Sequence, residues 1–157
     1  MDLNYKLYLE RADNELKLAD IIFQVSDKKD LQKEILDIAQ PETYFSSVIT
    51  HSYYCIFYSA KAYLLKKGIK TRAPEEHKKT FEEFKKLVDQ GIVDVELLKI
   101  YEKIMVRADT LLGIFSKEKF KRGKFTYHRL AQANYEPAKE SLDRAELFFK
   151  NIYSLVS

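Results

Sequence analysis

Apolar residues recur every three or four positions in four long stretches of the chain, residues 5–23, 45–64, 97–115 and 138–156. In the third stretch, for example, the series is Leu97, Tyr101, Ile104, Ala108, Leu111 and Phe115. This spacing places the apolar side chains along one face of an α-helix, the face that packs into a core. Two shorter stretches, residues 31–38 and 77–88, show the same spacing over fewer turns. The pattern predicts four long helices and one or two short ones.

The residues that flank these stretches agree with the predicted helix boundaries. Proline is tolerated in a first helical turn, Asp and Asn cap helix N-termini, and Gly ends helices. The boundary residues are Pro74 and Pro137 in first turns, Asp94 and Asn134 as N-caps, and Gly68 and Gly91 as C-terminal stops. We therefore predict one all-α domain over residues 1–157, an up-down bundle of four long helices with one or two additional short helices.

The composition narrows the class of protein. The chain has 157 residues, of which 46% are apolar and 13% aromatic, so it has enough core material to fold. No uncharged apolar run approaches the roughly 18 residues that a membrane helix needs. The N-terminal sequence has no basic region followed by an apolar stretch, so we expect no secretory signal. Cys55 is the single cysteine and has no partner for a disulfide within the chain. We expect a reduced, cytoplasmic protein that does not enter a membrane.

The small net charge of +3 conceals one strongly basic segment. Residues 116–129 contain one acid, Glu118, and six cations, Lys117, Lys119, Lys121, Arg122, Lys124 and Arg129. This segment therefore carries +5, and the rest of the chain carries −2. Three aromatic residues, Phe120, Phe125 and Tyr127, alternate with the cations. Cations hold phosphates and aromatic rings stack on unpaired bases, so the segment is a candidate RNA-binding site. The alternative is a solvated connection that faces the negative end of the preceding helix dipole.

Arg122 and His128 are the candidate catalytic pair within this segment. An imidazole can take the proton of a ribose 2′-hydroxyl, and a fixed guanidinium can stabilise the charge that develops on the phosphate. Five residues separate the two, so on one straight helix their side chains would diverge by about 120°. Gly123 permits a bend that would let them converge. The alternative is a surface arginine and a surface histidine that never meet.

The other histidines favour structural interpretations. His51 and Cys55 are four residues apart and share a helix face, which could hold a metal ion, but no second ligand pair accompanies them. Burial in the core is therefore the favoured interpretation for both residues, and we expect no metal site. His77 joins the apolar face of its short helix, so packing or capping is favoured over catalysis.

Two motifs and the C-terminal helix resemble the HEPN domains (higher eukaryotes and prokaryotes nucleotide-binding). The run SYYCIF at residues 52–57, followed by AKAYLL at residues 60–65, is similar to the second-helix signature of that family. The run EHKK at residues 76–79 resembles the motif that opens its next helix, and residues 132–149 resemble its last helix.

The resemblance implies a dimeric helical bundle without a cofactor. In active HEPN members an R-x(4–6)-H motif forms a metal-independent ribonuclease site at the dimer interface, and Arg122 and His128 match its spacing. The function expected from the resemblance is therefore an endoribonuclease, in some members the toxin of a toxin–antitoxin pair. In such an enzyme Lys119, Lys121, Lys124, Arg129 and Tyr127 would bind RNA.

Two other functions remain open at this point. The first is a non-catalytic HEPN module that binds a nucleotide or a partner nucleotidyltransferase. The second is a structural or assembly function that uses an exposed aromatic face, supplied by the eleven tyrosines and ten phenylalanines.

Overall fold

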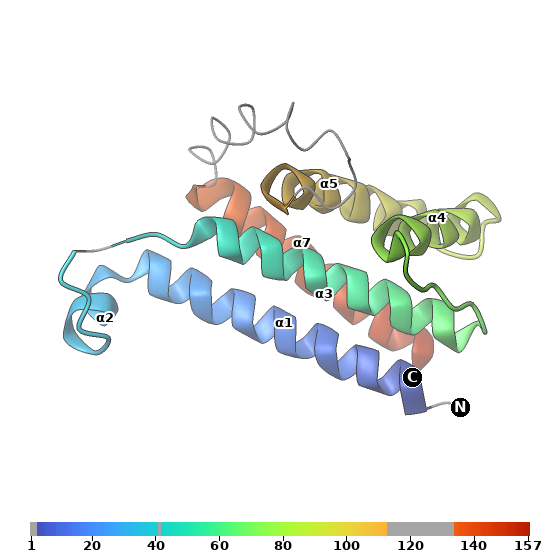
Figure 1. The fold of residues 1–157 in the computed structure, drawn as a ribbon, viewed down its shortest axis with the longest axis horizontal. Helices are drawn as coiled ribbons and strands as arrows, with labels where there is room; N and C mark the ends of the chain where they lie inside the picture. The colour runs from blue at the N-terminus through green and yellow to red at the C-terminus, as the bar shows by residue number, and fades with distance from the viewer. Residues whose placement is uncertain (1–2, 41, 113–133) are drawn as a thin grey trace.

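The computed structural model describes residues 3–40, 42–112 and 134–157, and the regular secondary structure of these residues is entirely helical (Figure 1). The helices are α1 (Leu3–Asp27), α2 (Lys29–Glu34), α3 (Phe45–Lys66), α4 (Glu76–Asp89), α5 (Val95–Leu112) and α7 (Tyr135–Val156). The prediction of an all-α protein is thus confirmed for the described residues. The predicted helix over 97–115 is confirmed to Leu112, and its last three residues lie outside the described ranges.

Helix α3 is the centre of the structure. It packs against α1, α7, α5 and α4, and α1 and α7 lie along its length (Figure 1). Most of its residues are buried because the apolar run from Ile56 to Leu65 covers more than one face of the helix. The start of α1 and the end of α7 lie at the same end of the molecule. The buried apolar side chains form two clusters, a larger one that includes Tyr53 and Tyr101 and a smaller one that includes Phe23 and Phe45. Leu16 of α1 packs against both clusters, so the core is continuous.

Most of the predicted helix boundaries are confirmed. The Asp94 carboxylate accepts a hydrogen bond of 2.9 Å from the backbone N–H of Glu96 at the start of α5. Asn134 precedes α7, and Pro137 lies in its first turn. Gly68 and Gly91 follow α3 and α4 with φ values of +81° and +74°, which glycine adopts without steric cost.

Two predicted boundaries are wrong. The helix near Pro74 begins only at Glu76, because Glu75 has a φ of +55° and separates the proline from the first turn. The short helix expected over 31–38 ends at Glu34, and Asp37 also has a φ of +55°. The buried Gln32 side chain fixes this region, since its amide bonds the Val25 carbonyl and both backbone groups of Glu42.

Within the described residues, none of the helices combines the length and the apolar composition that a membrane-spanning helix requires.

Candidate functional site

The residues predicted to act on RNA lie outside the described residues. They are the catalytic candidates Arg122 and His128 and the RNA-binding candidates Lys119, Lys121, Lys124, Tyr127 and Arg129. The described residues resume at Asn134. The next residue, Tyr135 of α7, packs on Phe23 and Phe45. The start of α7 therefore lies beside the end of α1 and the start of α3.

His51 and Cys55 lie on α3 with different partners. Nδ1 of His51 lies 2.5 Å from the Glu15 carboxylate of α1. Cys55 is fully buried, its Sγ lies 4.0 Å from the Ala145 carbonyl, and burial raises the pKa of its thiol. A protonated, buried thiol is a poor metal ligand. Across the described ranges, no three His, Cys, Asp or Glu side chains are grouped as a metal site would require.

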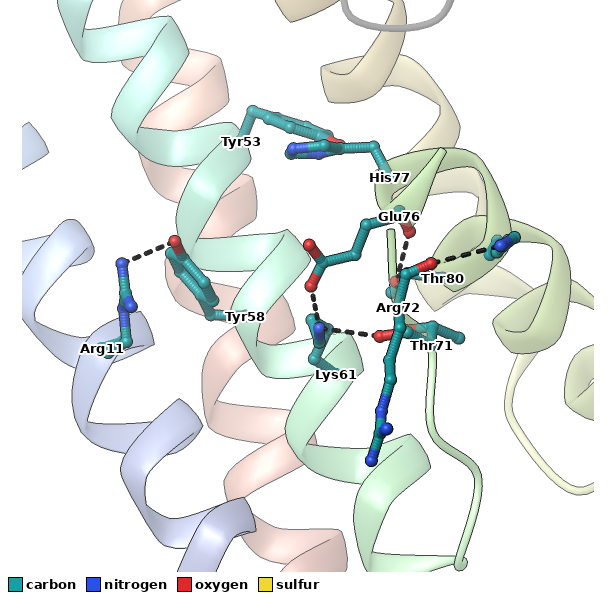
Figure 2. A network of polar contacts seen from close by, with 10 residues as sticks. Arg11, Tyr53, Tyr58, Lys61, Thr71, Arg72, Glu76, His77 and Thr80 are labelled. Carbon is teal, nitrogen blue, oxygen red and sulfur yellow. Dashed lines mark hydrogen bonds and ion pairs between the residues drawn. The ribbon is translucent and has the colours of Figure 1, made fainter. Parts of the chain in front are cut away.

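The two HEPN-like motifs contact each other at His77, which packs between α3 and α4. Its ring stacks on Phe57 with centroids 4.1 Å apart. Its Nδ1 lies 2.8 Å from the hydroxyl of the fully buried Tyr53, and Figure 2 shows the two side chains together. Burial lowers the pKa of His77 and Lys61 adds to the effect, while Glu76 opposes it. The imidazole therefore favours its neutral form, as a packing residue should.

Lys61 makes the second contact between the motifs. Its side chain is only 6% exposed, and its ammonium forms an ion pair with Glu76 at the start of α4. The same Nζ donates a hydrogen bond of 3.1 Å to the Thr71 carbonyl (Figure 2). It also lies 4.9 Å from the centre of the Tyr8 ring. A buried ammonium needs such partners because desolvation without them costs several kcal/mol. Lys61 thus connects α1, α3 and α4.

The connection between α3 and α4 is held by hydroxyl and carbonyl groups. The Thr71 and Thr80 hydroxyls lie 2.7 Å apart, and Thr80 Oγ1 also donates to the Glu76 carbonyl at 2.7 Å. Lys79 Nζ donates to the Arg72 carbonyl at 3.2 Å. Thr71 is buried and its neighbours Lys70 and Arg72 are exposed, so the fixed backbone presents both cations on the surface.

These elements surround a cleft of about 800 Å³ between the first half of α1, the end of α3 and the α3–α4 connection. Its charged lining consists of two acids, Glu10 and Glu76, and four cations, Arg11, Lys61, Lys70 and Arg72. The remaining lining residues are Asn4, Leu7, Tyr8, Asn14, Leu65, Ile69, Thr71 and Ala73. The cleft therefore carries a formal charge of +2, although the chain outside residues 116–129 is acidic overall.

Arg11 is oriented within this cleft by an aromatic residue. Its guanidinium donates a hydrogen bond of 2.7 Å to the Tyr58 hydroxyl and lies 4.4 Å from the centre of the Tyr58 ring (Figure 2). Among the described residues, the Arg11, Lys70 and Arg72 side chains form no ion pair. Three cations of the cleft therefore lack a carboxylate partner in the described part of the chain.

A separate ionic contact joins α5 to α7. Glu140 forms ion pairs with Lys103 at 2.7 Å and with Arg107 at 2.9 Å, and these contacts, led by that of Lys103, lower the pKa of its carboxyl. Arg107 also donates a hydrogen bond of 3.1 Å to the Ser141 hydroxyl. Its side chain thus holds α5 against α7, and Arg107 does not match the R-x(4–6)-H spacing.

The cleft was not predicted from the sequence. Its cations come from three separate regions, and two of them, Lys70 and Arg72, belong to the basic run KKGIKTR at residues 66–72. A second signal was Lys61, a charged residue between the apolar residues of AKAYLL. Such a residue is buried only with a partner.

Comparisons with protein-family models, with curated proteins and with solved structures found no match to this chain. The resemblance to HEPN domains therefore rests on the sequence motifs alone.

Proposed function

We propose that this protein is a HEPN-type, metal-independent endoribonuclease that acts as a homodimer. Its four long helices α1, α3, α5 and α7 would form an up-down bundle, and the basic segments of two subunits would meet at the interface. The observation that carries the proposal is the pair Arg122 and His128 at R-x5-H spacing within a segment of charge +5. The contacts of Tyr53 with His77 and of Lys61 with Glu76 support it indirectly, because they link the two HEPN-like motifs.

The proposed chemistry needs only side chains. His128 removes the proton of a ribose 2′-hydroxyl, the 2′-oxygen forms a bond to phosphorus, and the bond from phosphorus to the 5′-oxygen breaks. The leaving 5′-oxygen takes a proton from water, His128 later releases its proton to solvent, and a 2′,3′-cyclic phosphate end remains. Arg122 stabilises the negative charge on the phosphate oxygens in the transition state. Lys119, Lys121, Lys124 and Arg129 hold neighbouring phosphates, and Tyr127 stacks on a base.

The test is RNA cleavage by the purified full chain in EDTA, with analysis of the product ends. We expect cyclic phosphate ends, and a loss of at least 100-fold in rate for His128→Ala and for Arg122→Ala. His51→Ala is the matched control, because His51 lies on α3 with Glu15 as its partner, and it should cleave at the wild-type rate. Circular dichroism checks that each variant is folded. Wild-type cleavage by His128→Ala would refute the assignment.

A non-catalytic HEPN module is the alternative, and the +5 charge of the segment favours it as much as catalysis, because binding needs only the cations. Such a module would bind a nucleotide or a nucleotidyltransferase partner, as in a toxin–antitoxin pair. It would retain RNA or nucleotide without cleaving it, and its affinity would fall steeply with salt. The cleavage assay separates the two functions.

A further inference from the structure

Helix α1 has a second row of regularly spaced residues, on the side opposite its buried face. This outer row consists of Leu7, Arg11, Asn14, Leu18 and Ile21, which follow one another at intervals of four and three residues, and all five are exposed. Leu7 is 55% exposed and Ile21 is 57% exposed, although both side chains are apolar. Figure 1 shows α3 along the other side of α1, and no helix of the described residues lies along the outer row. The spacing is typical of a helix face that packs on another helix.

The end of α1 and the turn that contains α2 form an acidic end of this surface. Residues 27–42 include five acids and three lysines, all exposed, and therefore carry a charge of −2. In Figure 1, α2 and α3 lie on opposite sides of α1. The buried Gln32 amide fixes this turn through hydrogen bonds of 2.6, 2.7 and 2.8 Å with backbone groups. Ile35, which is 72% exposed, is therefore held outside the core together with the exposed Leu36.

The start of α1 forms a basic end of the same surface. Leu7 and Arg11 of the outer row also line the cleft described above, whose charged side chains sum to +2. Lys70 and Arg72 contribute to that charge from the adjoining α3–α4 connection. The two ends of the surface thus carry opposite charges of equal size. A second copy of the chain complements them when the two α1 helices run antiparallel, because each acidic end then faces a basic end.

The outer row is also symmetric about Asn14. Leu7 and Ile21 each lie seven residues from Asn14, so two antiparallel α1 helices that cross at Asn14 place Leu7 of one copy beside Ile21 of the other. An asparagine at a single core position of a helix pair fixes its register. A parallel pair would instead place Arg11 beside Arg11 and bring ends of like charge together.

Two charged residues beside the outer row agree with this register. Glu10 lies four residues before Asn14 and Lys17 lies three residues after it, so the antiparallel pair brings Glu10 of each copy near Lys17 of the other. Lys17 also pairs with Asp13 of its own helix at 2.6 Å, and its side chain is 70% exposed, so it can reach a second carboxylate. Opposite charges at such flanking positions set the orientation of helix pairs.

We propose that the outer row of α1 binds the outer row of a second copy of this chain, with the two helices antiparallel and crossing at Asn14. The pair has a twofold axis, so both copies use the same surface and the assembly closes as a dimer. One helix and one turn from each copy form a small interface, so we expect a Kd in the micromolar range. The inference goes beyond the proposed function, because the interface uses no residue of the basic segment and does not depend on catalysis.

The test is sedimentation equilibrium of the full chain up to about 100 μM, which is well above a micromolar Kd. We expect the wild type to associate, and Leu7→Lys/Ile21→Lys to halve its molar mass, because lysines then face each other across the interface. Leu7→Lys/Ile21→Glu should restore the wild-type mass, since the new lysine of one copy then lies beside the new glutamate of the other. The matched control is Ile92→Lys/Val95→Lys, which changes two exposed apolar residues outside the outer row and should keep the wild-type mass.

Circular dichroism checks that each variant is folded, as expected for substitutions of exposed residues. The proposal is overturned if the wild type is monomeric at this concentration, or if Leu7→Lys/Ile21→Lys keeps the wild-type mass. It is also overturned if the control loses mass equally. Failure of Leu7→Lys/Ile21→Glu to restore association would overturn it as well, because only the antiparallel orientation pairs these charges. RNA cleavage is measured separately, so an inactive wild type that associates through α1 would refute the ribonuclease and leave this interface.

Discussion

Replacement of His77 by phenylalanine should change how the stability of the protein depends on pH. His77 is half-buried, its ring stacks on Phe57, and Tyr53 is its hydrogen-bond partner. Burial lowers the pKa of His77 in the folded state, so the unfolded chain binds more protons as the pH falls below the ordinary histidine value. The contribution of the neutral imidazole to the free energy of unfolding is fully present above about pH 6.5 and is lost as the pH falls.

The contribution of His77 to the pH dependence of the free energy of unfolding has an upper limit. One proton taken up only by the unfolded chain costs about 1.4 kcal/mol between pH 7.5 and pH 5.5. Because His77 is only half-buried, water screens it, and we expect about 0.5 kcal/mol. His77→Phe keeps a flat ring against Phe57 but loses the hydrogen bond to Tyr53, which costs about 1 kcal/mol at pH 7.5. The stability difference between wild type and variant should therefore shrink at pH 5.5.

The assay is urea unfolding, followed by circular dichroism, of both proteins at pH 7.5 and pH 5.5. Lys78→Ala, an exposed neighbour on α4, is the control, and it should follow the pH dependence of the wild type. If the difference between wild type and His77→Phe stays constant or grows at pH 5.5, the assignment of a lowered His77 pKa is refuted.

Two further stability predictions concern α4 and α5. Glu76→Gln should lower the free energy of unfolding by about 2 kcal/mol, because it leaves the buried Lys61 ammonium without its carboxylate, although the exposure of Glu76 moderates the loss. Urea unfolding measures it, with Glu82→Gln on the same helix as control, and equal losses in both variants would contradict the reasoning. Asp94→Ala should cost about 1 kcal/mol by removing the cap of α5, whereas Asp94→Asn should retain most of the stability. Equal thermal midpoints for wild type and Asp94→Ala would exclude the capping contribution.

The predicted helices agree with the structure because their signals are local. A spacing of three and four residues, as in the series from Leu97 to Leu111, requires only that one helix face be apolar. Gly68 and Gly91 end their helices through a backbone conformation that their own lack of a side chain permits. The boundaries near Pro74 and at Glu34 were predicted wrongly. Both lie near a residue with a positive φ, Glu75 or Asp37, and the residue type alone does not predict that conformation.

The candidate functional residues also divide into those that the sequence alone identifies and those that only the fold brings together. The concentration of charge in residues 116–129 and the spacing of Arg122 and His128 are properties of consecutive residues, so the sequence alone determines them. The basic cleft is not such a property, because Arg11, Lys61 and Arg72 are far apart in the chain. Only the packing of α1 against α3, and the fixing of the α3–α4 connection by Thr71 and Thr80, brings them together. Charges that are dispersed in sequence generate a local field only when the tertiary structure reduces the distances between them.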